Sequence, residues 1–119
     1  MALAKSYAVT VTTDASGDAT AFISPKLPHN DRVLAVIYEK IDFATGVDFT
    51  ITTDVTNQNV WVETNVDASK TVNPSVGTHD TAGIATGARD YIVLASLERL
   101  KIVVANGGAM KTGKFTLVL

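Results

Sequence analysis

Apolar and polar residues alternate along several short stretches of this chain. In the run from Val47 to Thr52 every second residue is apolar, and aspartate or threonine stands between them. This period of two is typical of a half-buried β-strand. The run from Val33 to Ile37 is apolar on both faces, which predicts a strand that is covered on both sides. We expect the two strands to form a long hairpin at the middle of a sheet, joined by a loop from Asp42 to Gly46.

The same alternation predicts strands towards both ends of the chain. Residues 6–13 and 19–23 read as two strands, and Asp14-Ala-Ser-Gly-Asp between them has the turn-forming residues of a hairpin. Residues 98–105 and 114–119 read as two more strands, separated by a glycine-rich reversal. The pattern therefore predicts an N-terminal hairpin from Tyr7 to Ile23 and a C-terminal hairpin.

Two stretches in the middle leave alternatives open. Val60 and Val62 would share one face of a strand and Trp61 the other, so either both faces are covered or the tryptophan lies on an exposed patch. The run Asp90-Tyr-Ile-Val-Leu-Ala is too short for periodicity to decide between a strand and one or two turns of helix.

The least regular part of the chain lies between these stretches, and it is rich in alanine, serine, threonine and glycine. Connections of this length are uncommon in compact domains and are more often functional or flexible. We expect an extended loop over residues 68–89 that leaves the main body and carries a short strand from Thr71 to Val76.

Seven to eight short strands separated by turn signals favour an all-β fold, either an antiparallel β-sandwich or a jelly-roll-like barrel, with one long loop. The 119 residues are enough for one core. We therefore expect a single β-sandwich domain over residues 1–119, with residues 1–5 as an N-terminal arm.

Composition narrows the classes of function. The chain has no cysteine, which rules out a disulfide framework and thiolate metal sites. Ten basic and twelve acidic residues are dispersed along it, without the basic stripe that nucleic acid requires, so we expect no direct nucleic-acid partner. We find no run of signal-peptide or membrane-spanning length, and expect a protein that is made and kept soluble without a membrane partner.

Candidate chemistry is sparse. His29 and His79 lie in separate predicted loops, where a zinc site would need three or four converging ligands. The Asp14–Asp18 stretch resembles the front half of a calcium loop but lacks the later ligands, so a plain turn is favoured. Asp42 and Asp48 flank a predicted turn and read as solvated or turn-forming groups. We therefore expect neither an enzyme nor a cofactor or metal site.

One aromatic group offers an alternative. Trp61 with Tyr38 or Phe43 could form a platform on which a sugar stacks, as in a carbohydrate- or host-surface-binding β-sandwich. Aromatic side chains more often supply core or interface packing, and we favour that interpretation.

Three stretches together carry a resemblance to a known family: residues 9–20, residues 42–52, and residues 98–108 with the following Lys111-Thr-Gly. They resemble small structural proteins of tailed bacteriophages whose genes lie among the head-morphogenesis genes. The likeness covers most of the chain except residues 68–89. It implies a virion component, in the first place a capsid decoration or cement protein that bridges major capsid protein subunits at the capsid surface and assembles in the host cytoplasm. A neck, tail or other head-associated protein is the alternative.

A cement protein bridges its neighbours by shape and burial, often with extended segments. We expect the N-terminal arm and the loop to make these contacts, through the apolar residues Leu3, Pro74, Val76 and Ile84. Exposure of these residues in an isolated monomer would be unfavourable, so we expect a homo-oligomer, most simply a trimer around a local symmetry axis.

Overall fold

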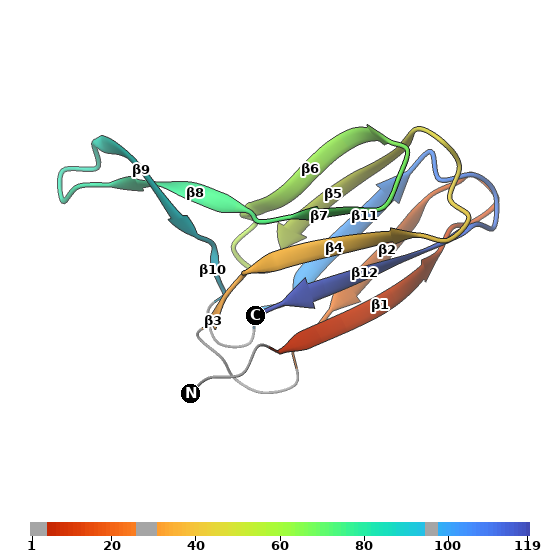
Figure 1. Ribbon diagram of the computed structural model, residues 1–119, viewed down its shortest axis with the longest axis horizontal. Helices are drawn as coiled ribbons and strands as arrows, with labels where there is room; N and C mark the ends of the chain where they lie inside the picture. The colour runs from red at the N-terminus through yellow and green to blue at the C-terminus, as the bar shows by residue number, and fades with distance from the viewer. Residues whose placement is uncertain (1–4, 26–30, 95–97) are drawn as a thin grey trace.

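The computed structural model describes residues 5–25, 31–94 and 98–119, and these residues form two antiparallel sheets packed face to face (Figure 1). The predicted all-β sandwich is confirmed. The first sheet has the order β1 (Ser6–Thr12), β12 (Thr112–Val118), β4 (Ala35–Lys40), β7 (Lys70–Val72). The second has the order β2 (Ala19–Ile23), β11 (Leu100–Ala105), β5 (Val47–Thr53), β6 (Asn59–Val66). Two further strand pairs lie beside them: β3 (Asp31–Arg32) with β10 (Val93–Leu94), and β8 (Ser75–His79) with β9 (Ala85–Tyr91).

The core lies between the two sheets and contains a cluster of aromatic rings. Phe49 on β5 packs edge-on against two rings of the opposite sheet, Tyr38 at 4.6 Å and Phe115 at 4.9 Å between centroids. Phe43 stacks on Tyr38 at 6.1 Å. Every second residue of β5, β11 and β12 is buried against this cluster, as the period-two pattern predicts.

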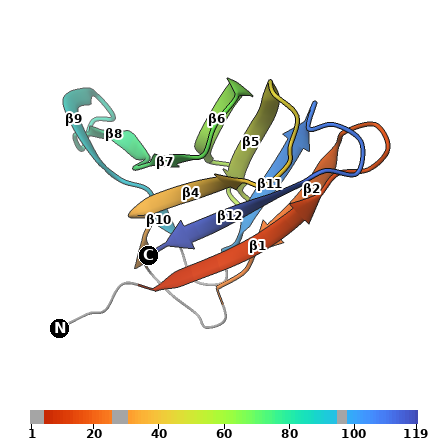
Figure 2. The ribbon, with the colours of Figure 1, turned by 45° about the vertical axis from the view of Figure 1, so that its right-hand side comes forward.

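The three predicted hairpins are wrong in one respect, because the strands of each pair lie in different sheets. Of the predicted strand Val33–Ile37, residues 35–37 belong to β4 in the first sheet, whereas Val47–Thr52 belongs to β5 in the second. The pairs β1 with β2 and β11 with β12 are divided in the same way (Figure 2). Alternation shows that a strand has one buried face. It does not show whether two strands joined by a turn pair within one sheet or lie in opposite sheets, because both arrangements bury these faces equally well.

Three of the connections that cross between the sheets, those after β1, β4 and β11, meet at one end of the sandwich. The backbone N–H of Gly107 donates to the Gly17 carbonyl at 2.9 Å, and the Gly107 carbonyl accepts from the Ala44 N–H at 2.9 Å. The Met110 N–H donates to the Asp14 carbonyl at 3.1 Å. A Cβ atom at Gly107 would lie 2.9 Å from the Thr13 methyl group, so the close approach requires glycine. The two turns and the loop are thus held as one unit.

A β-bulge resolves the alternatives around Trp61. Ile51 pairs with Trp61 and Thr52 with Asn59, which leaves Val60 as an extra residue. The strand therefore turns both Val60 and Trp61 inward, and Val62 is 54% exposed on the outer face.

The predicted extended loop over residues 68–89 is wrong in its local structure. It contains β7, β8 and most of β9, and the expected strand from Thr71 to Val76 is interrupted at Asn73-Pro74. Proline has no N–H to donate to a sheet and marks the point where the chain leaves the sandwich. The next stretch, from Asp90 to Leu94, completes β9 and forms β10, so it is extended and not helical.

Tyr38 provides a first testable prediction. Its side chain is fully buried, and within the described part of the chain no group forms a hydrogen bond with its hydroxyl. Burial raises the pKa of Tyr38 to about 12. A buried hydroxyl without a partner costs about 1–3 kcal/mol, so Tyr38→Phe should raise the free energy of unfolding by about 1 kcal/mol at neutral pH.

The pH dependence gives a second readout of the same change. Unfolding returns the Tyr38 pKa to its ordinary value near 10, so the unfolded state loses this proton first as the pH rises. The wild-type protein should therefore lose stability between pH 10 and about 12, and Tyr38→Phe should lose less. Urea denaturation of both proteins across this range measures the difference. A variant that is less stable than the wild type at pH 7 would contradict the prediction.

Candidate functional site

The most prominent feature outside the sandwich is the hairpin of β8 and β9, residues 75–91, which we call the projecting hairpin. Figures 1 and 2 both show it extending away from the two sheets. Within the described residues its strands pair only with each other. All seven residues of β9 are exposed. A two-stranded hairpin is at best marginally stable alone in water, so its tip and root must be stabilised locally.

The tip is formed by a five-residue turn. The Asp80 Oδ1 atom accepts hydrogen bonds from the N–H groups of Ala82 and Ile84, both at 2.9 Å. Gly83 has a φ of 79°, a left-handed conformation that glycine adopts without strain. Next to this turn, on the side of the sandwich, the Thr78 hydroxyl of β8 and the Thr86 hydroxyl of β9 form a hydrogen bond at 2.6 Å. These contacts fix the shape of the tip without a hydrophobic core.

At the root, Arg89 of β9 binds Ser75 of β8, while Asn73 and Val76 fasten the hairpin to the sandwich. Arg89 donates from Nε to the Ser75 hydroxyl at 2.7 Å and from Nη2 to the Ser75 carbonyl at 2.8 Å. Asn73 donates from Nδ2 to the Leu34 carbonyl of the sandwich at 2.9 Å. Val76 packs against the core. These contacts restrict the direction in which the projecting hairpin leaves the sandwich.

The four predicted partner-contact residues have different positions. Leu3 lies outside the described residues. Pro74 is buried at the root and Val76 is half-buried, so both stabilise the base of the projecting hairpin. Ile84 lies at the tip and is 63% exposed. Of the three that are described, Ile84 is therefore the one most open to a partner.

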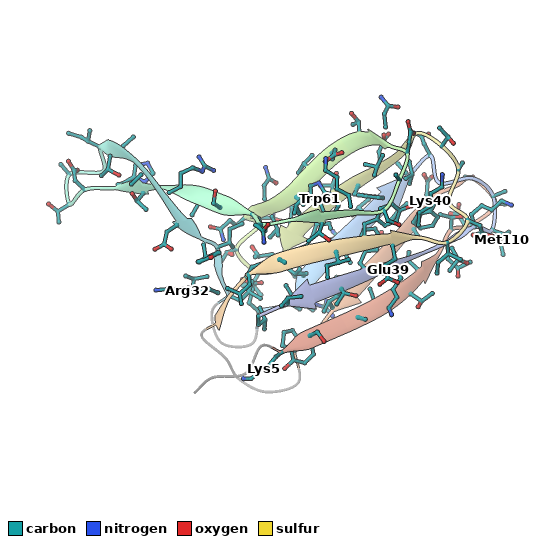
Figure 3. The ribbon with its side chains drawn as sticks, in the orientation of Figure 1. Lys5, Arg32, Glu39, Lys40, Trp61 and Met110 are labelled. Carbon is teal, nitrogen blue, oxygen red and sulfur yellow. The ribbon has the colours of Figure 1, made fainter. Side chains whose placement is uncertain are left out.

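The aromatic platform predicted as an alternative is not formed. Trp61, labelled in Figure 3, belongs to β6. It is 6% exposed and packs edge-on against Phe49 at 5.4 Å between centroids. Its indole N–H donates to Glu63 Oε1 at 3.0 Å. Lys70 also bonds to this carboxylate at 2.8 Å, and its hydrogen bond is the main cause that lowers the Glu63 pKa. Tyr38 and Phe43 are buried too, so a sugar could not stack on this group.

The other candidate groups have structural partners. Asp42 Oδ1 accepts from the Thr112 N–H at 2.5 Å, whereas Asp48 accepts from the Asn65 N–H at 2.9 Å and from Asn106 Nδ2 at 2.7 Å. The two carboxylates therefore fasten different segments of the chain. Of the two histidines, His79 is exposed in β8 and His29 lies outside the described residues.

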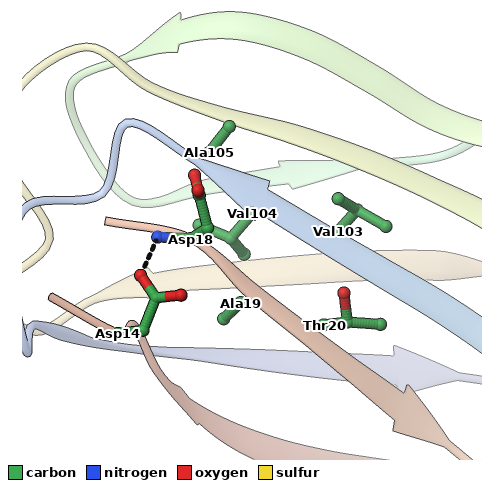
Figure 4. A pocket seen from close by; sticks show the side chains of 7 residues that line it. All are labelled: Asp14, Asp18, Ala19, Thr20, Val103, Val104 and Ala105. Carbon is green, nitrogen blue, oxygen red and sulfur yellow. Dashed lines mark hydrogen bonds between the residues drawn. The ribbon is translucent and has the colours of Figure 1, made fainter. Parts of the chain in front are cut away.

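A hollow of about 390 Å³ lies beside the N-terminal turn, next to β2 and β11 (Figure 4). Asp14 and Asp18 stand at one end of it. The Asp14 Oδ1 atom accepts from the N–H groups of Ser16 at 2.8 Å and Asp18 at 3.0 Å, so this carboxylate holds the turn together. In the residues that the structure covers, no group of three or more metal-ligating side chains is found, and no helix could cross a membrane.

Comparisons with known proteins add little information about the function of this chain. No protein-family model and no curated protein matches the sequence. Two solved structures from infectious bursal disease virus are similar: that of the Gx strain, with 13% identity and a TM-score of 0.28, and that of a mutant VP2 protein in derived particles, with 13% identity and a TM-score of 0.25. They cover 98% and 97% of this chain, which spans about a third, 32%, of each of theirs. Superpositions this weak say nothing about function.

Proposed function

We propose that this chain is a non-enzymatic structural protein of a tailed-bacteriophage virion, and within that class a capsid decoration or cement protein at the surface of the head. The sequence resemblance suggests the class. The projecting hairpin is the main structural support for this role. A stiff sandwich with an exposed pair of strands fits a protein that binds neighbouring capsid subunits through surface contacts. The major capsid protein is the expected partner.

The arrangement of the chain is consistent with adhesion to a neighbour. The sandwich buries its aromatic rings and engages the candidate carboxylates in internal hydrogen bonds. The projecting hairpin, in contrast, is held together by its turn and its root and leaves the whole of β9 exposed. Contact made by such an element would add surface area to an interface without disturbing the core. A neck, tail or other head-associated position is compatible with the same geometry, and the predicted trimer stays a prediction.

Shortening the projecting hairpin tests this role. Gly77 pairs with Arg89, so residues 78–88 can be replaced by Asn-Gly, the residues of a two-residue hairpin turn, while the Arg89 contact with Ser75 is kept. The residues removed contribute no buried core residue, so the free energy of unfolding should change by less than about 1 kcal/mol. Affinity for heads that lack the protein should fall by at least about tenfold.

Co-sedimentation with such heads measures the affinity, and urea denaturation measures the stability. Met110→Asn is a suitable control, since Met110 is 65% exposed at the end of the sandwich away from the projecting hairpin (Figure 3). It also has a φ of 54°, which asparagine tolerates. The proposal fails if the intact chain does not bind heads, or if the shortened variant binds as tightly as the control.

A further inference from the structure

The chain exposes a short apolar strip where the projecting hairpin joins the sandwich. Ile92 and Leu94 are buried in the core, so the alternate residues Tyr91 and Val93 of this extended stretch point outward. Tyr91 is 42% exposed and Val93 is 55% exposed. An aromatic and an aliphatic side chain therefore lie two residues apart on the surface.

Strand pairing places an arginine at each end of this strip. Arg32 of β3 lies directly opposite Val93 and so shares its face. Ser75 of β8 lies directly opposite Tyr91 in the same way, and the Arg89 Nε–H bond to the Ser75 hydroxyl keeps the arginine on this face too. Both arginines are exposed, and Figure 3 shows Arg32 at the same end of the sandwich as the projecting hairpin. We call Arg32, Arg89, Tyr91 and Val93 the root patch.

The positive charge of the root patch is left without an internal partner. Within the described part of the chain neither Arg32 nor Arg89 takes part in an ion pair. The hydrogen bonds of Arg89 go to the hydroxyl and the carbonyl of Ser75, which are neutral. Asp90, the carboxylate next to Arg89 in the sequence, accepts instead from the Tyr91 N–H at 2.7 Å. The two guanidinium groups are therefore complementary in charge to an acidic partner.

The spacing within the root patch indicates the shape of such a partner. Residues 89, 91 and 93 stand at alternate positions over about 14 Å, at about 3.4 Å per residue. An extended segment presents every second side chain at the same spacing, so carboxylates four residues apart would lie opposite the two arginines. An apolar side chain between them would lie opposite Tyr91. A hollow of about 280 Å³, lined by residues 73–75 and 89–91, gives this side chain room.

We infer that the root patch binds an extended acidic segment of the major capsid protein, with two carboxylates four residues apart and an apolar residue midway between them. Arg89 and Arg32 bind the carboxylates, and Tyr91 and Val93 cover the apolar side chain. Tyrosine and arginine are enriched among the residues that dominate binding energy at protein interfaces. The inference deepens the proposed function and rests on it, because it names the chemistry of the partner at the root of the projecting hairpin.

Arg32→Glu tests the charge, with Lys111→Glu as its matched control. Both residues are exposed, but Lys111 lies beside the turns at the opposite end of the sandwich. Co-sedimentation with heads that lack the protein, at low ionic strength, should show affinity lowered by about tenfold or more in Arg32→Glu and unchanged in Lys111→Glu. Added salt should weaken binding of the wild type and reduce its advantage over Arg32→Glu, because salt screens exposed charges. A difference that stays the same at every salt concentration would contradict pairing with carboxylates.

Val93→Ser tests the apolar strip, with Val62→Ser as its matched control. The two valines have nearly equal exposed fractions, 55% and 54%, and both point outward from a strand. The same co-sedimentation should show affinity lowered by about fivefold in Val93→Ser and unchanged in Val62→Ser. Urea denaturation checks that all four variants are folded.

The outcomes separate this inference from the proposed function. If the intact chain binds heads, but Arg32→Glu and Val93→Ser bind as tightly as their controls, the inference is overturned and the proposed function stands. If the intact chain does not bind heads, the proposed function fails and the inference fails with it.

Discussion

Gly113→Ala is expected to lower the free energy of unfolding by about 3 kcal/mol, at the upper end of what overpacking costs. Gly113 lies in β12, between β1 and β4. A Cβ atom there would lie 2.7 Å from Cδ2 of Phe43 and 3.0 Å from its Cζ. Phe43 is itself buried and stacked on Tyr38, so its ring has little room to move aside. The added methyl group must therefore distort the strand or displace the aromatic cluster.

Urea denaturation measures this loss, and Gly77→Ala serves as its control. A Cβ atom at Gly77 would meet no atom within 4 Å. That variant should stay within about 1 kcal/mol of the wild type, because the methyl group only restricts the unfolded chain. The double variant Phe43→Leu/Gly113→Ala should lose less than the sum of its single changes. A Gly113→Ala protein as stable as Gly77→Ala would refute the proposed steric clash.

Phe49→Ala should cost about 4 kcal/mol, within the range for removing a large buried aromatic side chain. Phe49 is the ring through which the second sheet contacts Tyr38 and Phe115 of the first, and it also packs on Trp61. Its removal leaves a cavity between the layers, bordered by rings that cannot all move inward.

Thermal and urea unfolding both report this loss, with Thr50→Ala as the control. Thr50 is the next residue of β5 and is exposed on the outer face of the same strand. It should change stability by less than about 0.5 kcal/mol. A Phe49→Ala protein that loses less than about 1 kcal/mol would show that the aromatic cluster does not hold the sheets together.

The strands of the sandwich could be predicted from the sequence because burial on one face imposes a period of two. Val47, Phe49 and Ile51 illustrate this, since all three face the core. Their pairing could not be predicted in the same way. The turns at Asp14–Asp18 and Asn106–Gly108 were identified correctly, but a turn reverses the chain without fixing which sheet the next strand enters.

The projecting hairpin was predicted only as an excursion from the sandwich. Beyond Val76 at the root, its strands show no alternation, because the core covers neither of their faces there and no side chain needs to be apolar. A signal for the hairpin was nevertheless present. Asp80-Thr-Ala-Gly has the spacing of Asp14-Ala-Ser-Gly, and in both turns the aspartate Oδ1 accepts two backbone N–H groups. Recognising this repeat would have placed a second tight turn at residues 80–84.

The partner-contact residues show a further limit of sequence reasoning. Pro74, Val76 and Ile84 are all apolar residues in an irregular stretch, and composition treats them alike. The structure separates them by position: Pro74 and Val76 complete the root, and Ile84 lies at the tip. Only the path of the backbone decides which of such residues is left for another protein.

The hydrogen bonds that join three connections around Gly107 also bear on how the molecule folds. Each of these connections carries the chain from one sheet to the other. Neither sheet is therefore built from one continuous segment of the sequence that could fold before the other. Most native contacts must then appear together, late and over long loops, which is typical of slow, all-or-none folding. Newly made chains would expose unpaired strand edges during that interval and would be most prone to aggregate then.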